Sequence, residues 1–216
     1  MKSLADSVLI FGVLLSLCLS VSGCIGPYGF QTGRALGKKG AGEMVLDLDF
    51  LALANEESFD ALPLGGFSGR MGISEKTDIG LVISLESLSY IYGRYQVLGN
   101  QHSAAALSLG LGGGAISTTS IDSHVYLLFP AWFSLHKGDF AWYLNPQWSL
   151  FWTSKQNDFT ISPASRLYVS TGIEYFVTPD IALLLNAGYA KLPESTITSL
   201  DSAFTFGLGF KVVLGK

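Results

Sequence analysis

The chain has 216 residues, of which 49% are hydrophobic and only 14% charged, and its formal net charge is -4. Ordinary soluble domains carry about 25% charged residues, so this chain has too little charge to cover a typical water-facing surface. Its 12% aromatic content also excludes a disordered chain, which would be polar and poor in aromatics. The mildly acidic balance offers no basic patch for nucleic acid. The length suits a single domain.

The N-terminal residues have the features of an export signal. Lys2 precedes an apolar run over residues 8–19, and small residues follow it. The run is shorter than the about 20 apolar residues that a membrane-spanning helix needs. Residues 21–24, Val-Ser-Gly-Cys, resemble the bacterial lipobox, in which small residues precede a cysteine that is lipidated and becomes the new N-terminus. The alternative is a plain secreted protein in which Cys24 is incidental.

The lipobox resemblance implies a lipoprotein signal peptide over residues 1–23 and a covalent lipid such as palmitate on Cys24. The mature chain would then have 216 − 23 = 193 residues, and Cys18 would leave with the signal, so that no internal disulfide is possible. Ile25 follows the cysteine in place of the Asp that marks inner-membrane retention in similar lipoproteins. An outer-membrane destination is therefore allowed, with residues 24–42 as a periplasmic N-terminal segment.

The rest of the chain, residues 43–216, is predicted to be all-β. Apolar and polar residues alternate with period two almost to the end, and turn residues separate the segments. Each segment is roughly ten residues long, which a tilted strand needs to cross a bilayer. We expect an antiparallel up-and-down transmembrane β-barrel of about ten strands, with eight to twelve possible. The expected strands cover residues 43–53, 65–74, 79–86, 90–98, 103–113, 122–135, 140–152, 165–177, 181–190 and 203–213.

The connections alternate in length. Longer, more polar links are expected over residues 54–64, 114–121, 153–164 and 191–201. Short turns are expected at residues 75–78, 100–102, 136–139 and 178–180, and the link at 87–89 is an exception. Outer-membrane barrels place short turns in the periplasm. An even number of strands then puts both chain ends in the periplasm, in agreement with a lipid anchor in the inner leaflet.

The two faces of the strands predict the orientation of the barrel wall. Phe206 and Leu208 share a bulky face, whereas Thr205, Gly207 and Gly209 share a small one. A soluble lipocalin-like barrel would turn the bulky face inward and need charge on the other. We therefore expect the bulky face to point into lipid. The rival is a lipid-tethered periplasmic barrel with its aromatic face inward, binding a hydrophobic ligand.

This orientation places eight charged side chains in the lumen. Four acids and four bases balance, and buried charges must be paired or hydrated. The sequence therefore predicts an ion-paired, closed lumen rather than an open charged channel. The predicted lumen network consists of Asp47, Asp49, Arg70, Glu86, Arg94, Arg166, Glu174 and Lys211.

Residues 31–37 and 72–80 resemble small bacterial outer-membrane β-barrel proteins of mostly unassigned function. The resemblance implies insertion into outer-membrane lipid by the outer-membrane assembly machinery, and the lipobox implies the lipoprotein-sorting machinery as a further partner. Gly207, Leu208 and Phe210 fit the terminal-strand assembly signal of such families. The chain departs from that pattern because it continues to Lys216 instead of stopping at an aromatic residue.

The chain contains residue types that two classes of barrel enzyme use for catalysis. In omptin proteases, an Asp pair and an Asp/His pair lie opposite each other. This chain has Asp47 and Asp49 on one expected strand, and Asp122 and His124 on another. At ~3.3 Å per residue, Asp47 and Asp49 are expected to lie on the order of 10 Å deeper in the barrel than Asp122 and His124. The two pairs are then too far apart to share a catalytic water.

Lipid A deacylases combine Ser, His and an acid, but Ser134 and His136 flank a turn expected in the periplasm, on the wrong leaflet. The three histidines, His102, His124 and His136, are scattered and predict no metal cluster. We expect no cofactor beyond the lipid on Cys24, and no catalytic residues. The favoured hypothesis is a non-enzymatic lipoprotein barrel with a structural or surface-interaction role. The alternatives are a narrow small-solute channel and an outer-membrane hydrolase.

Overall fold

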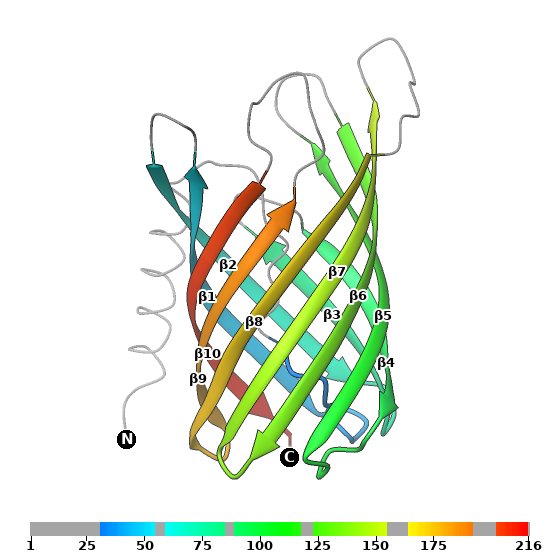
Figure 1. The fold of residues 1–216 in the computed structure, drawn as a ribbon. Helices are drawn as coiled ribbons and strands as arrows, with labels where there is room; N and C mark the ends of the chain where they lie inside the picture. Colours follow the sequence, from blue (N-terminus) through cyan, green and yellow to red (C-terminus); the bar gives the residue numbers. More distant parts are fainter. Residues whose placement is uncertain are drawn as a thin grey trace, which may run out of the picture.

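The computed structural model describes residues 31–54, 59–84, 89–117, 123–154, 164–191 and 202–215. These residues form ten antiparallel strands that close into a barrel (Figure 1). The strands are β1 (Gly42–Ala54), β2 (Phe59–Gly72), β3 (Thr77–Ser84), β4 (Tyr90–Leu98), β5 (Ala105–Ser117), β6 (Ser123–Lys137), β7 (Phe140–Ser154), β8 (Ala164–Thr178), β9 (Ile181–Lys191) and β10 (Ser202–Leu214).

Each strand pairs with the next along the chain, and β1 pairs with β10 from Gly42↔Leu214 to Leu53↔Ala203. The up-and-down barrel predicted from the alternating pattern is therefore confirmed. No helix in the described part of the chain is long and apolar enough to span a membrane.

The strand ends define two different rims. Short connections join β2 to β3, β4 to β5, β6 to β7 and β8 to β9 at one end, where β1 also begins and β10 ends (Figure 1). We call this the short-turn end. The expected link over residues 54–64 is mostly strand, because β2 starts at Phe59 and pairs with Ala54. Pro63 is tolerated in this extension because β3 has already ended at Ser84, opposite Gly66.

The outward orientation of the bulky face is confirmed. Leu208 is 56% exposed and Phe206 is 54% exposed. Thr205, which lies between the outward-facing Phe204 and Phe206, is buried. On β7, Trp148 points outward while Asn145 and Gln147 are buried in the lumen. A soluble barrel with an inward aromatic face does not fit this arrangement. The exterior is an apolar surface that water would solvate poorly and lipid would solvate well.

The lumen is filled by both aromatic and polar side chains. A buried aromatic cluster lines β3 to β6, with Tyr92 and Trp132 in contact at 5.3 Å between ring centroids. Buried polar and charged side chains lie on strands all round the wall, from Arg70 on β2 to Lys211 on β10. Small barrels are filled by their own side chains, and this lumen follows that rule.

Candidate functional site

Residues 31–41, which we call the N-terminal segment, lie inside the short-turn end of the barrel. In Figure 1 this segment is the blue trace within the lower part of the sheet. Gln31 and Thr32 are almost completely buried. The Gly40 amide donates to the Gly72 carbonyl at 2.9 Å, and the Gly72 amide donates to Ala41 at 2.9 Å. The segment, predicted as part of a periplasmic stretch over residues 24–42, thus runs from the rim toward the middle of the lumen.

Gly33 fixes the segment against β5 and β6. Its amide donates to Ser134 Oγ at 2.9 Å, and Ser108 Oγ donates to its carbonyl at 2.6 Å. A Cβ atom at this position would lie 2.5 Å from the carbonyl oxygens of Ala106 and Trp132. Only a glycine can therefore approach the wall this closely.

Gln31 fixes the inner end of the segment. The Tyr92 hydroxyl of β4 donates to Gln31 Oε1 at 2.7 Å, and Asn145 Nδ2 of β7 donates to the Gln31 carbonyl at 3.0 Å. Both partners are lumen side chains on opposite flanks of β5 and β6. The segment is thus held across the whole β4–β7 side of the wall.

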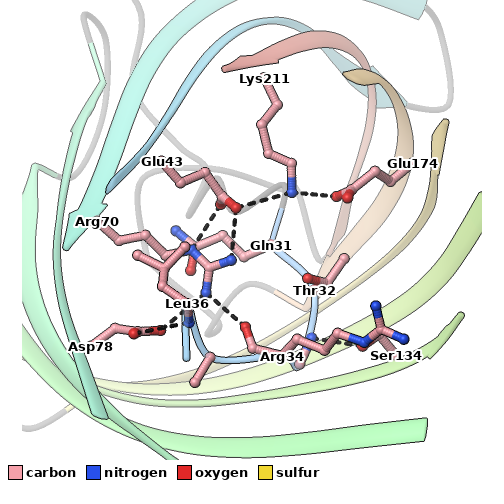
Figure 2. A network of polar contacts seen from close by, with 12 residues as sticks. Gln31, Thr32, Arg34, Leu36, Glu43, Arg70, Asp78, Ser134, Glu174 and Lys211 are labelled. Carbon is pink, nitrogen blue, oxygen red and sulfur yellow. Dashed lines mark hydrogen bonds and ion pairs between the residues drawn. The ribbon is translucent and has the colours of Figure 1, made fainter. Parts of the chain in front are cut away.

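The other side of the short-turn end is spanned by five ion pairs that link six buried side chains. Figure 2 shows five of the six, Glu174, Lys211, Glu43, Arg70 and Asp78. Arg70 and Glu43 form a two-pronged pair with distances of 2.7 and 2.8 Å. The members, which we call the ion-pair chain, are Glu174 (β8), Lys211 (β10), Glu43 (β1), Arg70 (β2), Asp78 (β3) and Arg94 (β4). Three acids and three bases balance, so buried charge is neutralised.

The distances along the ion-pair chain are those of direct, charge-assisted contacts. Lys211 Nζ lies 3.1 Å from Glu43 Oε2 and also contacts Glu174. Asp78 Oδ2 accepts from Arg70 at 3.1 Å and from Arg94 at 2.8 Å. No step in the chain requires a water molecule to bridge it.

The ion-pair chain and the N-terminal segment are one connected structure. Arg94 donates to the Thr32 carbonyl at 2.8 Å and also to the Arg34 carbonyl, to which Arg70 donates at 2.9 Å. The Leu36 amide donates to Asp78 Oδ1 at 3.2 Å. The ion pairs and the segment together cross the lumen from β8 through β1 to β7 and close the short-turn end.

A cavity of about 580 Å³ remains beside the segment at this end. Arg34, Lys38 and His136 contribute to its lining. Arg34 donates from Nε to the Ser103 carbonyl at 3.1 Å. Burial lowers the pKa of the Arg34 guanidinium, and the charge of Glu174 opposes that shift, but an arginine side chain stays protonated. The cavity is a recess on the short-turn side of the closure.

The structure brings four residues of the predicted lumen network together: Arg70, Arg94, Glu174 and Lys211. Asp47 and Asp49 lie higher on β1 and form none of the ion pairs found among the described residues. The Arg166 guanidinium stacks over Phe151 at 4.9 Å from the ring centroid. Glu86 lies outside the described residues. Two members of the ion-pair chain, Glu43 and Asp78, are absent from the sequence-based prediction.

The omptin-like arrangement is not assembled. Asp49 is seven residues above the start of β1, whereas His124 is thirteen residues above the end of β6. Six residues at ~3.3 Å each, on strands with ordinary tilt, separate the two by about 15 Å in depth. Asp122 and Cys24 lie outside the described residues.

Ser134 and His136 do meet, with Oγ 2.7 Å from Nε2. Ser134 is fully buried, however, and its hydroxyl already accepts the Gly33 amide. The pair therefore positions the N-terminal segment rather than presenting a nucleophile to substrate. Among the residues described by the structure, no three His, Cys, Asp or Glu side chains converge as metal ligands.

No protein-family model and no curated protein sequence matches this chain. Solved structures with a similar fold include Neisserial surface protein A, at 16% identity and a TM-score of 0.39 over 81% of this chain and 99% of that one. An outer-membrane channel from Pseudomonas putida F1 has 8% identity and a TM-score of 0.43, over 87% and 100% of the two chains. The outer-membrane protease OmpT from Escherichia coli has 9% identity and a TM-score of 0.43, over 82% and 95%. These similarities concern the fold alone.

Proposed function

We propose that this chain is a non-enzymatic outer-membrane β-barrel lipoprotein whose lumen is closed, and that its role is structural or surface-interactive. The observation that supports this proposal is the closure of the short-turn end by the ion-pair chain and the N-terminal segment together. A barrel closed in this way would block the passage of solutes through its short-turn end, as far as the described residues extend.

The membrane placement in this proposal depends on the exterior. Apolar side chains such as Leu111, Leu208 and Val177 are each more than half exposed on the outer face. In water such a surface would aggregate, whereas in a bilayer it is solvated. The short-turn end would then face the periplasm, and insertion would use the outer-membrane assembly machinery.

The lipid anchor in this proposal is a fatty acid on Cys24, delivered by the lipoprotein-sorting machinery. Cells grown with an alkyne-bearing palmitate analogue should label the wild-type protein and not Cys24→Ser. A Cys18→Ser variant is the matched control because that residue would be removed with the signal peptide. Equal labelling of wild type and Cys24→Ser would refute lipidation at this cysteine.

The closed lumen is tested by single-channel recording. The purified, refolded barrel in a planar lipid bilayer should give no steady conductance steps. Heat-modifiable gel mobility of the same sample would establish that the inserted protein is folded. Reproducible steps from folded wild-type protein would favour the second candidate, a narrow small-solute channel. The way in which the N-terminal segment is attached supports this second candidate. Its contacts with the strands described above are hydrogen bonds, which can break and let the segment leave the lumen.

A further inference from the structure

A group of oxygen acceptors lies in the lumen above the ion-pair chain. Asp47 and Asp49 are two residues apart on β1, so both side chains share the inner face. Asp49 is only 1% exposed, and neither of its carboxylate oxygens has a hydrogen-bond partner among the described residues. Oδ1 of Asp47 also lacks one. These carboxylates are therefore not explained by the closure of the short-turn end.

Asn186 of β9 points into the same place. Asp49 pairs with Gly207 on β10, and Gly207 pairs with Asn186, so the three residues form one row across the wall. A Cβ atom at Gly207 would collide with Asp49 Oδ1 and would lie 2.9 Å from Asn186 Oδ1. The two oxygens thus lie side by side over the glycine. Asn186 is 8% exposed, and its Oδ1 has no hydrogen-bond partner within the described ranges.

The wall is shaped around these oxygens. Gly66 leaves space for Asp47 as Gly207 does for Asp49, because a Cβ atom at either glycine would collide with the facing carboxylate. The nearby cation Lys211 is engaged by Glu43 and Glu174. Asp47 accepts backbone hydrogen bonds from Asp47 and Gly66, whereas Asp49 is buried with both oxygens unpartnered among the described residues. A buried carboxylate without donors or counter-charge is costly, and a bound cation removes that cost.

We propose that Asp47, Asp49 and Asn186 form a cation site in the lumen that takes Ca²⁺. Carboxylate and amide carbonyl oxygens are the ligands that Ca²⁺ prefers, and its flexible coordination suits donors arriving from two strands rather than one loop. Two carboxylates balance its charge. Mg²⁺ is a poorer fit because it demands a near-ideal octahedron. The sequence could not reveal this site, because Asn186 joins the acids only through the pairing of β1, β10 and β9.

Tb³⁺, a luminescent substitute for Ca²⁺, provides the test on the refolded barrel in detergent. Tyr143 lies in the same row of the wall, through Gly172, and would sensitise the emission of a bound ion. We expect saturable emission excited through tyrosine and displaced by Ca²⁺. Asp49→Asn and Asp47→Asn should each weaken Tb³⁺ binding at least about tenfold, since each removes a ligand charge. Asp139→Asn, at an exposed turn, is the matched control and should bind as wild type.

The Asn186→Asp variant tests whether residue 186 is a cation ligand or only a structural residue. As a third carboxylate it should tighten Ca²⁺ binding and raise the Ca²⁺-dependent increase in the unfolding temperature, while lowering stability in a chelator. Asn186→Ala should weaken binding. The proposal is overturned if folded wild-type barrel shows no saturable Tb³⁺ emission, as expected if the Asn186 amide group instead donates to a carboxylate. It is also overturned if Asp49→Asn, with unchanged heat-modifiable mobility, binds Tb³⁺ like wild type.

Discussion

Lys211, near the end of the last strand, donates to Glu43, near the start of the first, with Nζ 3.1 Å from Oε2. The two residues are 168 positions apart, and their contact bridges the junction at which β1 and β10 close the barrel. This junction completes the closed sheet of ten strands. The closure of the sheet and the closure of the lumen therefore share one ion pair.

Lys211→Met should destabilise the barrel strongly. The substitution leaves Glu174 buried without its counter-charge and removes one of two partners of Glu43. Removing one member of a buried pair costs about 3 kcal/mol or more. Urea unfolding of the refolded protein in lipid vesicles, followed by tryptophan fluorescence, would measure the loss. Lys137→Met, at the exposed end of β6, is the control and should stay within about 0.5 kcal/mol of wild type.

The double variant Glu174→Gln with Lys211→Met sharpens the same measurement. Because it removes both charges of one pair, it should recover part of the stability that Lys211→Met loses. A double variant as unstable as the sum of the two single variants would show that the loss is one of packing and not of charge.

Gly33→Val should release the N-terminal segment from the wall. The added side chain cannot fit beside the carbonyl oxygens of Ala106 and Trp132, 2.5 Å from a Cβ atom at this position. We expect trypsin to cleave after Arg34 in the variant but not in wild type, because Arg34 is held against Ser103 and the arginines of β2 and β4. Mass spectrometry of the digested, folded barrel would identify the cut.

Cleavage after Lys38 or Lys39, which are both exposed, serves as the internal control and should occur in both proteins. Protection of the Arg34 bond in Gly33→Val would mean that the segment remains seated, and the tight fit at Gly33 would then have no part in the closure.

The alternating pattern predicted all ten strands because each strand separates lipid from lumen. Successive side chains on a strand face lipid and lumen in turn, so the sequence alternates with the same period. Outward residues such as Leu208 can therefore be distinguished from inward residues such as Thr205 by sequence alone. The start of β2 was predicted six residues late, since Leu62, Pro63 and two glycines interrupt the pattern before Phe67.

The closed end of the lumen was only partly predictable. Glu43 shares its face with Asp47 and Asp49, and the same parity could have identified it as a lumen residue. Asp78 was assigned to a turn, although β3 begins one residue earlier at Thr77. Parity also says nothing of depth, so Asp49 could not be separated from the ion-pair chain without the register of the closed sheet.

The position of the N-terminal segment in the lumen could not be predicted from the alternating pattern, for a different reason. Its hydrogen bonds run from backbone atoms to lumen side chains, for example from the Gly33 amide to Ser134 Oγ. Such contacts impose no repeat on the sequence of the segment itself. Its place in the lumen follows only from the assembled wall.

Arg94→Met should combine a stability loss with release of the segment. Arg94 is buried and donates both to Asp78 and to two carbonyl groups of the segment, at Thr32 and Arg34. Methionine fills similar volume but leaves Asp78 with one cationic partner, so we expect a loss of about 3–5 kcal/mol in the same urea experiment. Arg94→Lys should rescue little, because an ammonium group cannot reproduce the fork of donors. Stability of Arg94→Met equal to that of the exposed-turn control Lys76→Met would contradict the role given to Arg94.

Leu208→Arg tests the lipid-facing exterior. Leu208 is central in β10 and points outward, so in a bilayer an arginine there should cost about 2–4 kcal/mol. Leu214 also points outward but lies at the rim of the same strand, where Leu214→Arg should cost about 0–1 kcal/mol. The comparison within one strand separates depth from the chemistry of the substitution, and folding into vesicles followed by heat-modifiable mobility measures both variants. Equal, small losses at the two positions would mean that this face does not contact the hydrocarbon core, and the barrel would then have to be soluble despite its apolar exterior.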